Sequence, residues 1–222
     1  MYCYINRLAH QLTTDLGQQD VETYQHLCDD LGPAVANPDA YQDYQGQYRD
    51  YWGMNAAGLT PAQFDAYFQF LADLAQQAQA DNGQIPGLDD ICETLTEICH
   101  QLHEMPNQQG RHCIYFSFAT KLVHMVYPDY PIYDSKVKAF YFLPDPAGDF
   151  GPRMGTLLPS YRFLHREYNR ILDDHLLDGA MALFANQLGD VGSPAKVIDW
   201  LIWTFVRALQ QGAIRDGQVV YR

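Results

Sequence analysis

Apolar side chains recur at steps of three and four along most of the chain, which is the spacing of one face of an α-helix. The clearest stripes lie in residues 64–74, 91–102 and 197–209. The last stripe also includes Trp200 and Trp203, so it is apolar on nearly all sides and is expected to be deeply buried. With 47% hydrophobic and 18% charged residues in a chain of 222, this pattern predicts a globular all-α fold.

Capping residues and prolines set the limits of the expected helices. Thr60, Pro61 and Gln63 form a helix start with a capping box, and Ser193 with Pro194 starts the last helix, which Gly212 ends. Further helices are expected over residues 1–32, closed by Gly32-Pro33, and over 39–52, 88–104, 111–126, 135–142 and 161–188. Residues 143–160 contain four prolines and three glycines and are predicted to form a long surface loop.

A proline and a glycine in the run Gln84-Ile85-Pro86-Gly87 indicate a joint between two lobes. The expected division is an N-terminal helical lobe, 1–87, and a lobe over 88–222 that begins with a helix, a tight turn and a helix. Charge is divided unevenly as well. Residues 1–110 hold two basic and sixteen acidic side chains, a net charge of −14, whereas residues 111–222 hold twelve and eleven, a net charge of +1.

This charge asymmetry predicts that any anion-binding face lies in the second half of the chain. The acidic first half is a candidate surface for a basic protein partner, although an ordinary solvated surface fits the same numbers. The N-terminus lacks the pattern of a signal peptide, and no run of about 18 apolar residues occurs, so we expect a cytoplasmic protein without a membrane partner.

Residues 114–138 bring most of the candidate chemistry together. Pro131 restricts the approach to Ile132 and Tyr133, so the loop that delivers Asp134 is expected to be stiff. Asp134 and Ser135 are both good N-cap residues for the next helix, and Lys136 and Lys138 follow at once. Two interpretations of Asp134 are open at this point, a helix cap only or a functional carboxylate.

Other residue patterns carry less chemistry. The aromatic side chains of residues 41–52 are spaced for a helix face that packs in a core or stacks on bases. The five cysteines lack CxxC spacing, and the His and Cys residues near position 105 lack paired ligand spacings, so we expect no disulfide framework, no metal site and no cofactor. His124 is expected in the core or as a partner of Asp134.

Several short runs resemble one family. Ser117-Phe118-Ala119-Thr120-Lys121, His124 and Pro131-Ile132-Tyr133-Asp134-Ser135 are similar to motifs of bacterial proteins with an 8-oxoguanine DNA glycosylase fold, a subgroup of the helix-hairpin-helix DNA glycosylase superfamily. Tyr51-Trp52-Gly53-Met54-Asn55 and Lys196-Val197-Ile198-Asp199-Trp200 also resemble that subgroup. The rest of the chain agrees only in being helical.

The resemblance implies a DNA glycosylase, monofunctional and hydrolytic, that removes a damaged or modified base in DNA repair or in defence against foreign DNA. Asp134 matches the catalytic aspartate of the family. The residues it implies for contact with DNA or substrate are Arg111, His124, Tyr133, Ser135, Lys136, Lys138, Tyr51, Trp52 and Asn55. The alternative is a catalytically inactive protein of the same fold that serves as a protein-interaction module.

Two departures from the family pattern affect this expectation. The family hairpin has two closely spaced glycines whose amides hold a DNA phosphate, whereas residues 107–111, Asn-Gln-Gln-Gly-Arg, contain one. The family lysine nucleophile follows the hairpin directly, whereas Lys121 lies about three turns further along. Lys121 is therefore expected near Asp134 either as an ion-pair partner or as a displaced nucleophile.

Overall fold

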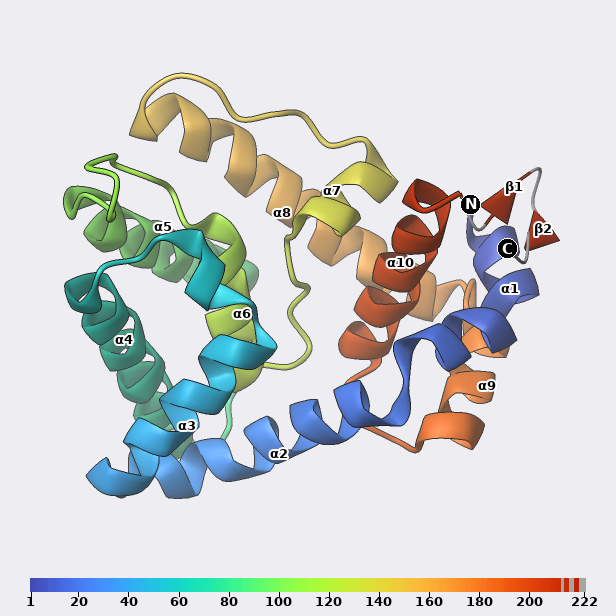
Figure 1. The fold of residues 1–222 in the computed structure, drawn as a ribbon, viewed down its shortest axis with the longest axis horizontal. Helices are drawn as coiled ribbons and strands as arrows, with labels where there is room; N and C mark the ends of the chain where they lie inside the picture. Colours follow the sequence, from blue (N-terminus) through green and yellow to red (C-terminus); the bar gives the residue numbers. More distant parts are fainter. Residues whose placement is uncertain (213, 216–217, 220–222) are drawn as a thin grey trace. The chain divides into compact units, whose positions relative to one another are not determined.

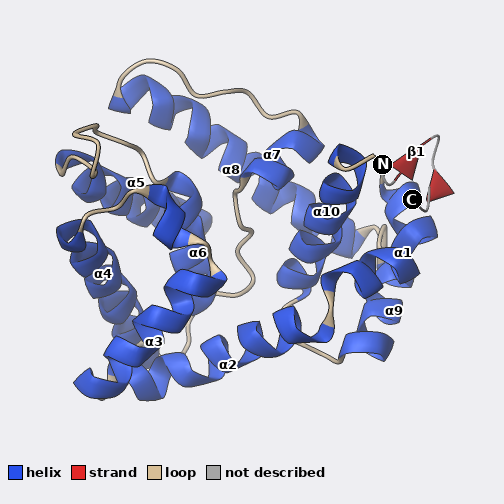
Figure 2. Cartoon of the chain, in the orientation of Figure 1, coloured by secondary structure: helices blue, strands red, loops and turns tan. Residues whose placement is uncertain are grey.

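The computed structural model describes residues 1–212, 214–215 and 218–219. Within them the fold is all-α, as the hydrophobic periodicity predicts (Figures 1 and 2). The helices are α1 (Tyr2–Leu16), α2 (Gln18–Val35), α3 (Pro38–Tyr51), η1 (Met54–Ala57, a 3₁₀ turn), α4 (Pro61–Ala80), α5 (Leu88–Glu104), α6 (Phe116–Val126), α7 (Ser135–Tyr141), α8 (Phe150–Asp173), α9 (Asp178–Leu188) and α10 (Pro194–Gln210). Two short strands, β1 (Ile214–Arg215) and β2 (Gln218–Val219), pair antiparallel.

The chain forms two compact units, and neither is a single stretch of sequence. Unit 1 contains Met1–Val21, Pro128–Asp145 and Pro159–Arg222, and unit 2 contains Glu22–Tyr127 and Pro146–Leu158. The units thus differ from the expected lobes 1–87 and 88–222. The expected joint at residues 84–87 is a turn inside unit 2, because α4 and α5 on either side of it pack together and both contact α6.

Unit 1 is built around α10, which contacts α1, α7 and α9 (Figure 1). Most of its side chains are buried, including Trp200 and the apolar stripe from Val197 to Val206, as expected from the sequence. Trp203 is only partly buried and Leu209, the last residue of the stripe, is exposed. The cap is also as predicted, since the Ser193 hydroxyl accepts a hydrogen bond from the Lys196 amide at 3.0 Å. The same hydroxyl donates to the Pro128 carbonyl at 2.8 Å and so ties the start of α10 to the loop before α7.

Unit 2 has an aromatic core between α3 and α4. Tyr44 and Tyr48 are buried, which confirms the packing interpretation for these two members of the tyrosine stripe. The hydroxyls of Tyr48 and Tyr67 lie 2.7 Å apart, and Tyr67 donates to the Phe118 carbonyl at 2.9 Å. The tyrosines therefore bury their rings and satisfy their hydroxyls inside the unit.

Several predicted helix limits are wrong. The helix expected over 1–32 is divided at Gly17, which has a φ of 87°, and the helix expected over 161–188 is divided after Asp173. Helix α2 continues past Pro33, since proline removes only its own N–H and the Ala36 amide still donates to the Gly32 carbonyl. Helix α8 begins at Phe150, inside the predicted loop, because Pro152 lies in its first turn, where a missing N–H leaves no helical bond unmade. Helix α6 begins at Phe116 instead of 111, because the preceding residues belong to the turn described below.

Gln63 holds the start of α4 against the end of α5. Its side-chain oxygen accepts from the Thr60 amide at 3.0 Å, while the Thr60 hydroxyl accepts from the Gln63 amide, so the predicted capping box is present. Its side-chain nitrogen donates to the carbonyls of Leu102 and Met105 at 3.0 and 2.8 Å. Gln63 is fully buried and its bond to the Leu102 carbonyl is buried as well, so water does not replace the side chain at that carbonyl.

Replacing Gln63 with leucine keeps the volume close but removes these hydrogen bonds of the side chain, while the backbone amide still bonds the Thr60 hydroxyl. We expect the Gln63→Leu variant to lose about 2–3 kcal/mol of unfolding free energy, measured by urea denaturation, because buried polar groups are left without partners. The Gln69→Leu variant is a matched control on the same helix, since Gln69 is exposed and bonds only Asp73. Equal effects of the two changes would show that the buried carboxamide is not what joins the two helices.

Candidate functional site

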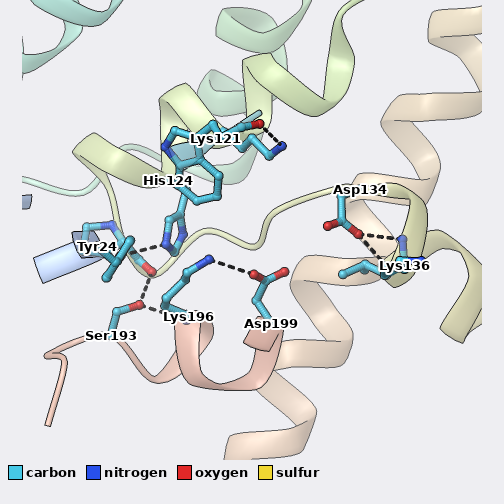
Figure 3. A network of polar contacts seen from close by, with 11 residues as sticks. Tyr24, Lys121, His124, Asp134, Lys136, Ser193, Lys196 and Asp199 are labelled. Atoms are coloured by element: carbon cyan, nitrogen blue, oxygen red, sulfur yellow. Dashed lines mark hydrogen bonds and ion pairs between the residues drawn. The ribbon is translucent and has the colours of Figure 1, made fainter. Parts of the chain in front are cut away.

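Asp134 is the N-cap of α7, as its sequence context predicts. Its Oδ1 atom accepts hydrogen bonds from the amides of Lys136 and Val137, both at 2.8 Å (Figure 3). The residues before it, Ile132 and Tyr133, are buried, so the loop is anchored on the side from which it arrives. Both amide bonds end on one oxygen, which fixes the orientation of the carboxylate and leaves Oδ2 outside the cap.

The residues around Asp134 differ in what they can contact. Ser135 is exposed, whereas Tyr133 is buried and burial raises the pKa of its hydroxyl. Lys136 donates to the Gln210 side chain at the end of α10, and Lys138 pairs with the exposed Asp145. Surface pairs of this kind are weak, so both ammonium groups can exchange these partners for an anion.

The end of α7 has an unusual backbone. Phe142 has a φ of 52°, in the left-handed region that favours glycine. Its amide donates to the Ala139 carbonyl, and the Leu143 amide donates to the Lys138 carbonyl, which together form a Schellman turn. A phenylalanine in this conformation costs about 1 kcal/mol relative to glycine.

A buried ion pair lies at the start of α10 in the same unit. The Lys196 Nζ atom is 3.0 Å from Asp199 Oδ2 and 4.8 Å from the centre of the Trp200 ring (Figure 3). Both side chains are almost completely buried, at 2% and 5% exposure. Each charge therefore stabilises the other at a position with almost no access to water.

Tyr168, on α8, lies close enough to the carboxylates of Asp199 and Asp134 for their charges to change the pKa of its hydroxyl. Burial first, and then the charge of Asp199, raise the pKa of Tyr168 well above its usual value, with a smaller contribution from Asp134. Its hydroxyl is buried and has no hydrogen-bond partner among the described residues. Unit 1 therefore groups Asp134 with one buried tyrosine and one buried ion pair.

In unit 2, Lys121 lies among aromatic rings. Its Nζ is 5.2 Å from the centre of the Trp52 ring and 5.1 Å from that of Phe118, and it donates to the Trp52 carbonyl at 3.5 Å. These contacts hold the ammonium by cation–π attraction. Because Asp134 belongs to unit 1, the expected approach of Lys121 to Asp134 stays a prediction.

The other expected site residues of unit 2 have mainly internal contacts. His124 is fully buried, and its Nε2 lies 2.9 Å from the Tyr24 hydroxyl, which places it in the core. Asn55 is exposed and bonded to Arg49 and Asp50. Tyr51 and Trp52 are partly exposed, and their rings meet edge to face at 4.7 Å.

The turn between α5 and α6 satisfies its own amides. The Asn107 side-chain oxygen accepts from the amides of Gln109 and Arg111, both at 2.9 Å. The Gly110 amide donates to the Asn107 carbonyl, and the Gln108 amide donates to the Gly58 carbonyl. All four amides of residues 108–111 are thus occupied, so this turn holds no amide ready for a phosphate; only the exposed Arg111 side chain remains for that purpose.

The expected site residues therefore fall into two groups. Unit 1 brings together Tyr133, Asp134, Ser135, Lys136 and Lys138, and unit 2 contains Tyr51, Trp52, Asn55, Arg111, Lys121 and His124. Within the described residues, no group of three or more His, Cys, Asp or Glu side chains is arranged to hold a metal ion. No helix in the described part of the chain has the length and apolar character needed to cross a membrane.

Comparisons with models of protein families, with curated proteins and with solved structures gave no match to the chain. The resemblance to helix-hairpin-helix DNA glycosylases therefore rests on the short motifs alone, and the family assignment stays a prediction.

Sequence reasoning missed the special roles of three residues. Phe142 carried a weak signal, because the helix 135–142 ends without the glycine that usually follows a helix. Asn107 carried a stronger one, since asparagine commonly bonds the backbone two residues ahead in a turn. Tyr168 carried none, because its surroundings come from segments distant in sequence.

The Asn107 side chain has a testable structural role. We expect the Asn107→Ala variant to lose about 1 kcal/mol of unfolding free energy, because two partly buried backbone amides of the turn lose their acceptor. The Asn107→Asp variant keeps an acceptor oxygen and should lose less than the alanine variant in the same urea titration. An Asn107→Ala variant with the unfolding free energy of the wild type would contradict this structural role of the Asn107 side chain.

The buried ion pair makes a different prediction. We expect Lys196→Met to lose about 3–5 kcal/mol of unfolding free energy, because it leaves the charge of Asp199 buried without its counter-ion. The double variant Lys196→Met/Asp199→Leu removes both charges and should recover most of that loss. If the loss in the double variant equalled the sum of the losses in Lys196→Met and Asp199→Leu, the two charges would not be coupled.

Proposed function

We propose that this protein is a DNA N-glycosylase that hydrolyses the bond between a damaged or modified base and its deoxyribose, with Asp134 as the catalytic carboxylate. One observation carries the proposal. The Asp134 carboxylate is fixed through Oδ1 at the start of α7, at the end of a loop anchored by buried residues. Such preorganisation is what electrostatic stabilisation of a transition state needs.

The chemistry follows from the position of the charge. Breaking the glycosidic bond leaves positive charge on the sugar, and a carboxylate placed below it stabilises that charge. Oδ2, which the cap leaves unused, is the oxygen that would face the sugar or accept a proton from the attacking water. Water as the nucleophile makes the enzyme monofunctional, and the aromatic contacts of Lys121 support a structural role for that amine.

The surroundings of Asp134 also support DNA as the substrate. Lys136 and Lys138 lie on the same short helix, and Ser135 is exposed beside them. Two ammonium groups and a hydroxyl next to the carboxylate suit contacts to the phosphates that flank an extruded nucleotide. The reaction would serve repair or defence against foreign DNA.

A second candidate function is favoured by the charge of unit 2. The unit holds four basic and fifteen acidic side chains, a net charge of −11, and its turn at residues 108–111 has no available amide. A surface of this charge repels phosphate and attracts a basic protein. On this alternative the protein is a catalytically inactive interaction module.

The Asp134→Asn variant tests the catalytic assignment. Asparagine keeps the capping oxygen and the shape of the side chain, so thermal unfolding should be unchanged within a few degrees. Base release, measured on a panel of duplexes with damaged and phage-type modified bases, should fall about a hundredfold or more, because the carboxylate charge is lost. Unchanged release by this variant would rule out Asp134 as the catalytic group.

The two candidate functions differ in how DNA affinity depends on salt. A glycosylase that contacts phosphates through Lys136 and Lys138 should bind duplex DNA less tightly as salt rises, and each change to glutamine should lower that slope by about one. The interaction module should show no DNA affinity at either of two salt concentrations in a polarisation assay, and no base release.

A further inference from the structure

Phe142 is the most exposed large hydrophobic side chain among the described residues, at 83%. Exposure of an aromatic ring to water is unfavourable in free energy. An exposed ring of this size therefore suggests a function other than stabilising the fold. Its neighbours Tyr141 and Leu143 are partly buried, whereas Pro144 and Asp145 are exposed. On α7 and residues 142–145, all of which the structure describes, Phe142 is thus the one large apolar side chain that is exposed.

The backbone at Phe142 adds a second cost at the same position. The residue closes the Schellman turn of α7 in the left-handed conformation, where glycine would fit without strain. Exposure and strain both disfavour phenylalanine for folding. A phenylalanine that is present despite both costs is a candidate for contact with another molecule.

Phe142 and Asp134 flank the same helix. Asp134 caps the first turn of α7 and Phe142 follows its last turn, so their backbones lie about 12 Å apart along the helix. Lys136 and Lys138 lie between them, and α7 itself contains no acidic residue. The carboxylate, the two cations and the ring are thus carried by one rigid element.

We propose that Phe142 inserts between stacked bases of duplex DNA, next to the nucleotide that is extruded toward Asp134. This inference rests on the proposed glycosylase function and names the element that grips the DNA, α7 instead of the turn at residues 108–111. An apolar wedge fills the space left by an extruded base and keeps the base from returning. The lysines on the same helix supply the phosphate contacts that a wedge needs.

DNA fits this ring better than a protein partner does. Protein hot spots are rings embedded in a well-packed apolar patch, whereas Phe142 is 83% exposed at the end of a helix that carries two lysines and no acidic residue. Base stacking needs only one ring, because each base offers its own flat face. The occupied amides of residues 108–111 also remove the competing place for a phosphate grip.

The test compares Phe142→Gly and Phe142→Trp with the wild type and with Ile85→Ala, a control at an exposed apolar residue of unit 2. The probe is a short duplex with one 2-aminopurine beside a tetrahydrofuran abasic analogue, since 2-aminopurine becomes brighter when it is unstacked. We expect wild type, Phe142→Trp and Ile85→Ala to brighten the probe. Phe142→Gly should not brighten it and should bind about tenfold more weakly. Its thermal midpoint should rise, because glycine relieves the left-handed strain.

Three results would overturn the inference. One is full brightening by Phe142→Gly, and another is a lower thermal midpoint, which would reveal a packing role for the ring. The third is no brightening of the probe by the wild type. If Phe142→Gly then changed the sedimentation of the protein, the ring would make a protein contact instead of a DNA contact. The Asp134→Asn variant separates this inference from the proposed function, because it should brighten the probe fully while base release is lost.

Discussion

Backbone N–H and C=O groups at helix ends and turns lack a partner within the helix and need another hydrogen-bond partner. In this protein, side chains supply several of these partners. Asp134 accepts two amides at the start of α7, Asn107 accepts two in the turn before α6, and Gln63 links the start of α4 to the end of α5. The same chemistry has opposite consequences for function. At Asp134 it orients a carboxylate, whereas at Asn107 it occupies the amides that a phosphate would need.

The distribution of charge agrees with this division. Once the chain is folded, unit 2 carries a net charge of −11 and unit 1 the remaining −2 of the total −13. The contrast between sequence halves, −14 and +1, weakens because unit 1 takes its residues from both halves. The expectation that any anion contact lies outside the acidic part of the chain stays a prediction, and unit 1 is where Asp134 and its lysines lie.

Local signals in the sequence predicted local structure well. The capping box at Thr60, the cap at Ser193 and the cap at Asp134 all formed as expected, because each depends on residues within one helical turn. The division into units could not be predicted, since it depends on which apolar faces pack together over long separations. Lys196 and Asp199 are only three residues apart, but their burial depends on how α10 packs against other helices, so the sequence showed a familiar run of residues and not a buried ion pair.

Unit 1 also contains three features that are unfavourable for stability alone. They are the buried ion pair on α10, the Tyr168 hydroxyl without a partner among the described residues, and the left-handed Phe142. Helix α7, which carries Asp134 and ends at Phe142, packs directly against α10. Natural sequences break local rules mainly where function requires it. Two of the three features, the ion pair on α10 and Phe142 at the end of α7, therefore lie on helices that pack together, and under the proposed function this helix pair is where residues that act with Asp134 are expected.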